Sequence, residues 1–230
     1  QAQDPFLREQ ELDLRRRLYV HDEFADDRVE DGTVVCPMAI SGDSWSAGFG
    51  IPRQVQRPEE ASGAYAFVPV IVEERDLERI RCDPEVRVDW AETERRRQRL
   101  EELYQGVLPV AVRGRDFFWF YPMDQFIVWR GIEQTFIDLI ERPALIHEAL
   151  ERITRGYLSS VEQLESLGAL SPGHGNTRLG SGGYGWTAAL PGPGFDGRRV
   201  RLCDLWARAA TQIFTDGISM TVMPPNAEKA

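Results

Sequence analysis

The fold is decided by the stretch from Gly131 to Gly168, which reads GIEQTFIDLIERPALIHEALERITRGYLSSVEQLESLG. Its apolar residues recur at steps of three and four, first in a short run before Pro143 and then in a longer run after it. This spacing places them on one face of a helix, so it predicts a short amphipathic helix followed by a long one. Pro143 suits the first turn of the long helix, where a missing N–H costs nothing, and Gly168 suits its end. We therefore expect the apolar face of this segment to pack on a larger body.

The rest of the chain supplies strand, helix and loop signals around this stretch. Strands are predicted, from β-rich or apolar runs, at 33–40, 64–72 and 107–112. Helices are predicted at 4–24, 73–80, 89–104 and about 204–214. In the third of these helices we expect Trp90, Leu100 and Leu103 to face inward. Residues 171–195 are rich in glycine and predict a long loop.

The composition sets limits on partners and location. The chain has 230 residues, a formal net charge of -10 and 42% hydrophobic residues, which fits one globular domain, or at most two small ones, with a sizeable core. Its acidic balance argues against a nucleic-acid partner bound through phosphates. No apolar run approaches the roughly 18 residues needed to span a bilayer, and no signal-peptide pattern begins the chain. Cys36, Cys82 and Cys203 follow no disulfide pattern, so we expect a cytoplasmic protein without a membrane partner.

Two regions combine residue types that are typical of binding sites. Residues 117–129 are rich in aromatic side chains, which more often form core than site. Asp124 lies among them, and desolvation there would raise the pKa of its carboxyl group. Long loops in compact domains tend to be functional, so a pocket mouth is predicted at 171–195. It would be formed by His174, Arg178, Tyr184 and Trp186. A surface loop without a site remains the alternative.

Six stretches of the sequence, taken in order, resemble one superfamily. They are DPFLREQELDLRRRLYVHDEF (4–24), DLERI (76–80), VLPVAVRG (107–114), WRGIEQTFIDLIERPALIHEALERIT (129–154), GYGWTAALPGPGF (183–195) and CDLWARAATQIFTDGIS (203–219). Together they resemble the uroporphyrinogen decarboxylase-like superfamily, which includes porphyrinogen decarboxylases and methylcobamide:coenzyme M methyltransferases. The resemblance runs from about Asp4 to Ser219. Its specificity lies in the collinear set, because no single stretch is a decisive catalytic motif.

The resemblance implies the fold of that superfamily, an α/β protein built as a single (β/α)8 TIM barrel. Such a barrel takes about 250 residues, whereas this chain has 230 residues and four or five strand signals. We therefore expect only the N-terminal part of the barrel, a truncated member, at residues 1–219, followed by a polar tail at 220–230. An open partial barrel exposes strand edges, so we also expect self-association.

The resemblance leaves three functions open. The first is zinc-assisted methyl transfer from a corrinoid-type donor to a thiol in a full-length parent, with a corrinoid protein as partner and no cofactor within this chain. The family's zinc is held by His and Cys ligands in the second half of the barrel, a part that this sequence does not contain. The second is cofactor-free decarboxylation of a tetrapyrrole carboxylate. The third is a non-catalytic barrel module completed by a partner.

The sequence departs in one respect from the family pattern that decarboxylation would require. Uroporphyrinogen decarboxylases grip substrate carboxylates with an RQAGR-type motif, and LRRRLY at 14–19 is not that motif. The clustered cations that could replace it are Arg178, Arg198, Arg199 and Arg201. Without the usual arginine motif to bind its carboxylates, a polyanionic porphyrinogen is a less suitable substrate.

In a barrel of this kind the site lies at the carboxyl ends of the strands. We expect four residues to face the pocket there: Asp124, His174, Tyr184 and Asp204. Either carboxylate would handle protons, and the histidine would act as a base or polar contact. Tyr184 would form a wall or donate a hydrogen bond, while Arg178 and Trp186 would contact a small-molecule substrate, namely a tetrapyrrole, a corrinoid or a methylated compound. We assign no metal ligand.

Overall fold

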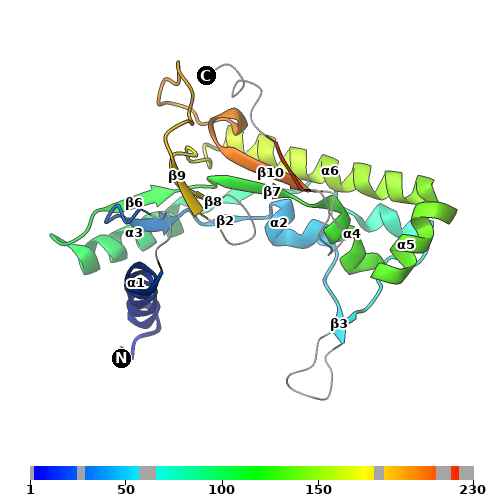
Figure 1. Cartoon of the computed structure of the whole chain (residues 1–230), viewed down its shortest axis with the longest axis horizontal. Helices are drawn as coiled ribbons and strands as arrows, with labels where there is room; N and C mark the ends of the chain where they lie inside the picture. Colours follow the sequence, from blue (N-terminus) through cyan, green and yellow to red (C-terminus); the bar gives the residue numbers. More distant parts are fainter. Residues whose placement is uncertain (1–2, 25–28, 57–65, 179–183, 211–218, 223–230) are drawn as a thin grey trace.

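The computed structural model describes residues 3–24, 29–56, 66–178, 184–210 and 219–222. Its helices are α1 (Pro5–Glu23), α2 (Ser44–Ala47), α3 (Trp90–Tyr104), α4 (Pro122–Arg130), α5 (Ile132–Glu141) and α6 (Pro143–Ser166), with 3-10 turns η1 (Gly48–Gly50), η2 (Glu74–Arg79) and η3 (Leu202–Asp204). Its strands are β1 (Val34–Pro37), β2 (Ile40–Ser41), β3 (Val55–Gln56), β4 (Ala66–Phe67), β5 (Arg87–Val88), β6 (Val110–Arg113), β7 (Phe117–Phe120), β8 (Gly175–Arg178), β9 (Tyr184–Thr187), β10 (Trp206–Ala210) and β11 (Ser219–Val222). Helices and short strands are therefore interspersed along the described chain (Figure 1).

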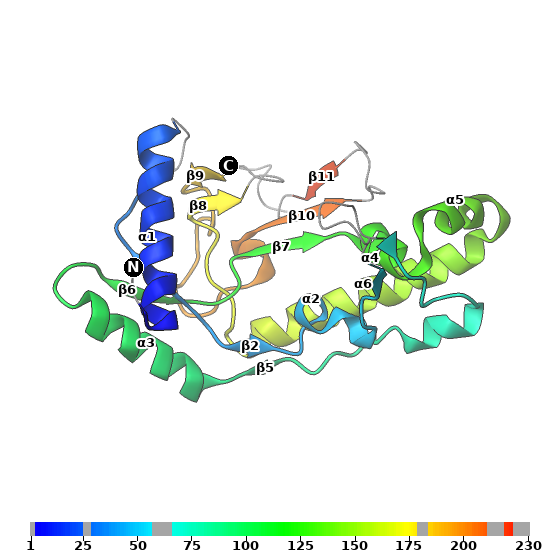
Figure 2. The same cartoon turned by 90° about the horizontal axis from the view of Figure 1, so that it is seen from below.

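Four strands form two parallel pairs. β1 pairs with β6, with Cys36 opposite Val112, and β7 pairs with β10, with Phe118 opposite Ala207. β6 and β7 lie end to end in both views (Figure 1 and Figure 2), separated only by residues 114–116. Parallel strands need a long crossover connection, and α4, α5 and α6 supply it between β7 and β10. The described part of the chain is thus a mixed helix-and-sheet protein with small sheets. That it forms the N-terminal part of a TIM barrel stays a prediction.

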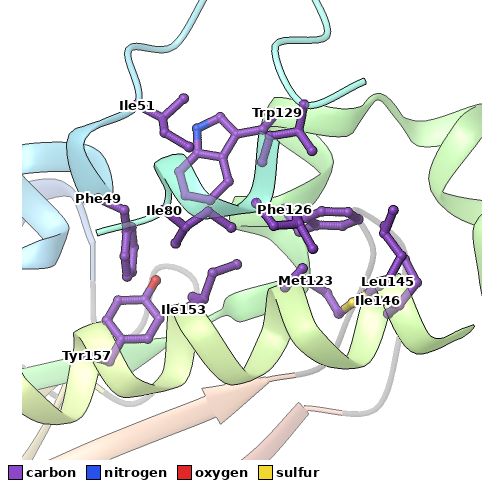
Figure 3. Close-up of a cluster of buried hydrophobic side chains, with 13 residues drawn as sticks. Phe49, Ile51, Ile80, Met123, Phe126, Trp129, Leu145, Ile146, Ile153 and Tyr157 are labelled. Atoms are coloured by element: carbon purple, nitrogen blue, oxygen red, sulfur yellow. The ribbon is translucent and has the colours of Figure 1, made fainter. Parts of the chain in front are cut away.

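The long helix α6 has the predicted start and the predicted apolar face. It begins at Pro143, and Gly168 beyond its end has a φ of 66°, a left-handed conformation that favours glycine. Its buried apolar side chains are Leu145, Ile146, Ala149, Ile153, Tyr157, Val161 and Leu164. Figure 3 shows part of this face packed against Phe49, Met123 and Trp129. Burying a side chain of this size contributes roughly 1.5–3 kcal/mol, so α6 organises the core as the sequence predicts.

The short helix α5 also forms as predicted but buries little of its apolar face. Ile132, Phe136 and Ile140 are 47%, 46% and 85% exposed. The helix is held instead by Asp138, whose buried carboxylate pairs with Arg130 of α4. A buried ion pair therefore attaches α5 to the rest of the protein, whereas α6 is attached by the burial of apolar side chains.

Two predictions about the C-terminal third are wrong. The helix expected from about residue 204 is absent up to residue 210, where η3 is followed by strand β10; residues 211–214 lie outside the described residues. β10 pairs on one side with β7 and on the other with β11, and this pairing outweighs the helix propensity of its alanines. The long loop expected at 171–195 contains the antiparallel pair β8 and β9. Strand β11 includes Met220–Val222 of the expected polar tail.

Two earlier segments also differ from expectation. Of the three residues of α3 that were expected to face inward, only Leu100 is buried. Trp90 and Leu103 are 51% and 41% exposed. The strand expected at 64–72 is reduced to β4 among its described residues, and 64–65 lie outside them. The backbone N–H groups of residues 70 and 71 donate to the carbonyl oxygen of Trp129, at 2.7 and 3.0 Å, rather than to a strand. This segment therefore fastens to the end of α4.

Candidate functional site

The predicted site residues lie in two parts of the fold. Asp124 lies half-buried in the first turn of α4, just after β7. His174 is exposed immediately before β8, and Trp186 of β9 is 49% exposed. Arg178 and Tyr184 are opposite each other in the β8–β9 pair, but their side chains lie outside the described residues. Their role in binding substrate stays a prediction.

Asp204 is buried, but its carboxylate is engaged within its own turn. Its Oδ2 accepts hydrogen bonds from the backbone N–H of Arg201 at 2.9 Å and from Nε of Arg201 at 3.3 Å. Its backbone carbonyl accepts from the N–H of Gly173, next to His174, at 3.0 Å. The geometry assigns Asp204 a role in closing the η3 turn and joining it to residues 173–174, and its catalytic role stays a prediction.

Two of the four arginines expected to form a cationic cluster are engaged at the surface. Arg199 pairs with Glu165 at 3.4 Å, and Arg201 pairs with Asp204. The side chains of Arg199 and Arg201 are 61% and 58% exposed. Such exposed pairs contribute little to stability and leave the guanidinium groups in water.

A cation that sequence reasoning missed lies between β6 and β7. Nη2 of Arg115 donates to both carboxylate oxygens of Asp43, at 3.0 and 3.1 Å. The backbone of Arg115 is fixed as well, because its N–H donates to the carbonyl of Ala169 at 2.9 Å and its carbonyl accepts from the N–H of Ser171 at 2.8 Å. Gly114 allows this close approach, since a Cβ there would lie 2.1 Å from the carbonyl oxygen of Ala169. Backbone and side chain of Arg115 are therefore both held.

Asp43 is fully buried and its carboxylate is saturated with hydrogen bonds. It caps α2 by accepting from the backbone N–H groups of Trp45 and Ser46, at 3.0 and 3.1 Å, and from the Ser46 hydroxyl at 2.8 Å. Together with Arg115 these donors satisfy a charge that would otherwise be costly to bury. Asp43 thus connects the turn after β2 to the segment between β6 and β7.

Arg115 keeps binding capacity that Asp43 does not use. Its side chain is 35% exposed, and in the described part of the chain Nη2 is the one guanidinium nitrogen with a hydrogen-bond partner. A guanidinium carries five N–H donors, so those on Nε and Nη1 remain available. The Trp45 ring lies beside it, with its centroid 5.9 Å from Cζ of Arg115. The site therefore presents a fixed cation next to an aromatic face.

Two tyrosines and Asp124 extend this site. Burial raises the pKa of Tyr121, the Asp124 carboxylate raises it further, and the Arg115 guanidinium lowers it. Burial also raises the pKa of Tyr157, whose ring centroid lies 6.2 Å from that of Tyr121 and 4.6 Å from that of Trp45. Both phenols are therefore protonated at neutral pH. We call Asp43, Trp45, Arg115, Tyr121 and Asp124 the Arg115 site.

A separate groove of about 1490 Å³ runs between α1 and the body of the protein. α1, seen at one end of the molecule in Figure 2, has no buried residue. Its contacts with α3 include a hydrogen bond between Tyr104 and Gln10 and the Phe6 ring, over which Cζ of Arg99 lies at 3.8 Å. The groove is lined by charges of both signs, among them Glu9, Arg113 and His174. His174 is exposed at this groove and Asp124 does not line it, so the groove does not bring these two predicted acid–base residues together.

Sequence signals for the Arg115 site existed but were weak. Arg115 follows the predicted strand at 107–112 by three residues, which is where parallel strands carry functional side chains. Asp43 lies in a Gly/Ser-rich run, SGDSWSAGFG, that reads as a loop, and its capping of α2 is visible only in three dimensions. Of the residues of the Arg115 site, Asp124 alone was predicted from the sequence as a site residue.

Comparison of the chain with models of known protein families, with curated proteins and with solved structures gives no match. None of the helices in the described parts of the chain is both long and apolar enough to cross a membrane.

Proposed function

We propose that this chain supplies the substrate-binding part of an enzyme of the uroporphyrinogen decarboxylase-like superfamily, acting at the Arg115 site. The complete enzyme would transfer a methyl group from a corrinoid-type donor to a thiol. The collinear resemblance from Asp4 to Ser219 supports the superfamily, and the parallel pairs β1–β6 and β7–β10 are compatible with it. We further propose a cytoplasmic location, supported by three cysteines that are free in the structure.

The observation that carries this proposal is that the Asp43–Arg115 ion pair lies within electrostatic range of Tyr121, which Asp124 also influences. These residues come from segments up to 81 positions apart in sequence and combine a cation, two carboxylates and a protonated phenol. Methyl transfer releases the proton of the thiol, and the proposed acceptor of this proton is the carboxylate of Asp124. Tyr121 can donate a hydrogen bond because its raised pKa keeps the phenol protonated.

Zinc is the metal that the resemblance implies. In the parts of the chain that the structure describes, no three His, Cys, Asp or Glu side chains are grouped so that they could hold a metal ion. The described residues do not fit a zinc site, so we assign no zinc ligand and derive no step through zinc. Asp124 and Tyr121 are proposed to handle protons, and His174, Arg178, Tyr184, Trp186 and Asp204 keep the roles proposed from sequence.

Decarboxylation of a carboxylate substrate is the second candidate. It is favoured by Arg115, a fixed and partly exposed cation that could hold a carboxylate where the expected arginine cluster is engaged at the surface. Loss of CO2 leaves a carbanion that must be protonated, and the phenol of Tyr121 is a suitable proton donor. No metal is needed for that step.

The two candidates are separated by assaying the purified protein for metal content and for both reactions. Loss of methylcobalamin in the presence of coenzyme M supports methyl transfer. CO2 release from uroporphyrinogen without metal supports decarboxylation. For whichever reaction is observed, Asp124→Asn should lower kcat by about 10²-fold or more, whereas Glu148→Gln on the exposed face of α6 should leave it unchanged. Absence of binding of either substrate to the purified protein would overturn the proposal, and substrate binding without turnover would favour a non-catalytic, partner-completed module.

A further inference from the structure

We infer that Arg115 binds the carboxylate of an aromatic small molecule and that Asp43 is its positioning residue, which names the substrate class of the Arg115 site and rests on the proposed function. Carboxylates are the planar anions that guanidinium groups bind by charge-assisted hydrogen bonds. Nε and Nη1 of Arg115 have no partner among the described residues, and the side chain is 35% exposed. The cation is therefore available to a ligand from solvent.

Preorganisation distinguishes Arg115 from Arg87 and Arg199, two exposed arginines that also pair with carboxylates. The exposed arginines at 87 and 199 pair with carboxylates that are themselves partly in water, so both partners can move. Asp43 is 0% exposed and is fixed by three further hydrogen bonds, so it holds Nη2 in one place. A ligand that binds to a side chain already fixed loses less conformational entropy. Asp43 thus holds the Arg115 guanidinium in place through Nη2, and Nε and Nη1 remain able to donate hydrogen bonds to a ligand.

The surroundings indicate an aromatic carboxylate rather than a small hydrophilic one. The half-buried Trp45 ring lies 5.9 Å from Cζ of Arg115, and Tyr121 is within electrostatic range of the same guanidinium. An aromatic ring attached to the carboxylate could stack on these side chains. Asp43 already neutralises one charge and Asp124 adds a negative charge near Tyr121, so we expect modest affinity, with a Kd on the order of 1 mM for a minimal ligand.

Benzoate is the minimal probe, and benzamide is its neutral control of the same shape. Titration of the whole protein at constant ionic strength, followed by the ¹⁵N–¹H signal of Nε of Arg115, should show saturable shifts with benzoate and none with benzamide. The signal is assigned by its absence in Arg115→Lys. That variant keeps the charge beside Asp43 and should fold, yet it should bind benzoate about tenfold more weakly by calorimetry, because it loses the planar donors.

A matched set of variants separates binding from folding. Arg115→Gln could leave Asp43 uncompensated, so the double variant D43N/R115Q, which removes both charges, is compared with it; both should abolish benzoate binding. Arg87→Gln, at an exposed Arg–Glu pair, should bind as the wild type does. For the positioning role, Asp43→Asn should keep the Nε signal of Arg115 but broaden it and weaken benzoate binding severalfold, a spectroscopic change that loss of global stability alone would not produce.

Several results would overturn the inference. They are absence of saturable benzoate binding, equal binding of benzamide, unchanged binding by D43N/R115Q, or tighter binding of inorganic phosphate than of benzoate. These outcomes are distinct from failure of the proposed function. If benzoate binds but neither family reaction is catalysed, the inferred anion site stands and the proposed activity is wrong. If a reaction is catalysed but benzoate does not bind, the proposed activity stands and the inferred anion site is wrong.

Discussion

The carboxylate of Asp138 accepts a hydrogen bond of 2.6 Å from Nε of Arg130, and the two side chains are 0% and 4% exposed. Nη1 of the same arginine donates to the carbonyl oxygen of Ile71 at 3.0 Å, so the pair joins α4, α5 and the segment after β4. The other carboxylate oxygen accepts from Gln134 and from Arg142. Both carboxylate oxygens of Asp138, and Nε and Nη1 of Arg130, thus have hydrogen-bond partners.

Replacing Asp138 by Asn should strongly destabilise the protein. The change leaves the Arg130 guanidinium buried without its counter-charge, and breaking a buried pair in this way costs about 3–5 kcal/mol. The free energy of unfolding, measured by urea denaturation, should fall by that amount. Glu148→Gln is the control, because Glu148 pairs with Arg152 on the surface of α6 and should change stability by less than about 1 kcal/mol. Equal effects of the two substitutions would contradict the assigned role of the pair.

Gly156 in the middle of α6 is a site where a better helix former should destabilise. Alanine in a helix interior is normally favoured over glycine by about 1 kcal/mol. Here the added Cβ would lie 2.7 Å from Cε1 of Phe49 and 3.0 Å from the carbonyl oxygen of Arg81. We expect Gly156→Ala to lower the free energy of unfolding by about 1–3 kcal/mol, because overpacking outweighs propensity.

The matched control for this change is Thr154→Ala, at an exposed position of the same helix. It adds no contact and should be neutral or slightly stabilising in the same thermal or urea unfolding experiment. If Gly156→Ala raised stability as Thr154→Ala does, the packing of Phe49 against α6 would have to be different from that in Figure 3.

Local periodicity in the sequence predicted the helices well, because their apolar faces are set by residues close together in the chain. α6 is the clearest case, with its start at Pro143 and its buried face both as expected. The same reasoning failed at Trp206–Ala210, where pairing with β7 and β11 decides the structure and nothing local signals it. Strands that form because they pair with distant parts of the chain could not be predicted from the local sequence pattern.

The candidate site shows the same division. Asp124 was found because a carboxylate stands out in an aromatic segment. Asp43 and Arg115 are 72 positions apart, and either alone looks like an ordinary polar residue near a turn. Their relationship depends on how the β2–α2 turn meets the β6–β7 segment, which is a tertiary property. The superfamily resemblance and its activity remain proposals for the same reason, since no local motif carries them.

Cys36 should be the least reactive of the three cysteines. Its side chain is fully buried on β1, and burial raises the pKa of its thiol. Only the thiolate is alkylated, so at about pH 8 Cys36 should react with iodoacetamide far more slowly than the partly exposed Cys82 and Cys203. Mass spectrometry of digested samples measures the three rates, and in concentrated urea they should become equal. Fast alkylation of Cys36 in the folded protein would show that β1 is open to solvent.

Stability should fall at alkaline pH because of buried tyrosines. Burial raises the pKa of Tyr157, Tyr121 and Tyr104 above the ordinary value near 10. Since the folded state then holds these protons more tightly than the unfolded state, their stabilising contribution is complete below a pH of about 10 and is lost as the pH rises above it. Urea unfolding at several pH values measures this slope. Tyr157→Phe should make the decline above pH 10 shallower, whereas Tyr19→Phe, at an exposed position, should not.

The same substitution has a second expected effect at neutral pH. The Tyr157 hydroxyl is buried and has no hydrogen-bond partner of ordinary geometry among the described residues, and Figure 3 shows its ring beside Phe49. Removing an unsatisfied buried hydroxyl relieves a desolvation penalty, so Tyr157→Phe should raise the free energy of unfolding by about 1 kcal/mol. Tyr104→Phe is the contrasting control, because Tyr104 makes a hydrogen bond of 3.3 Å to Gln10 and its loss should destabilise. A loss of stability in Tyr157→Phe would mean that the hydroxyl is paired, for example with the nearby backbone of Tyr121.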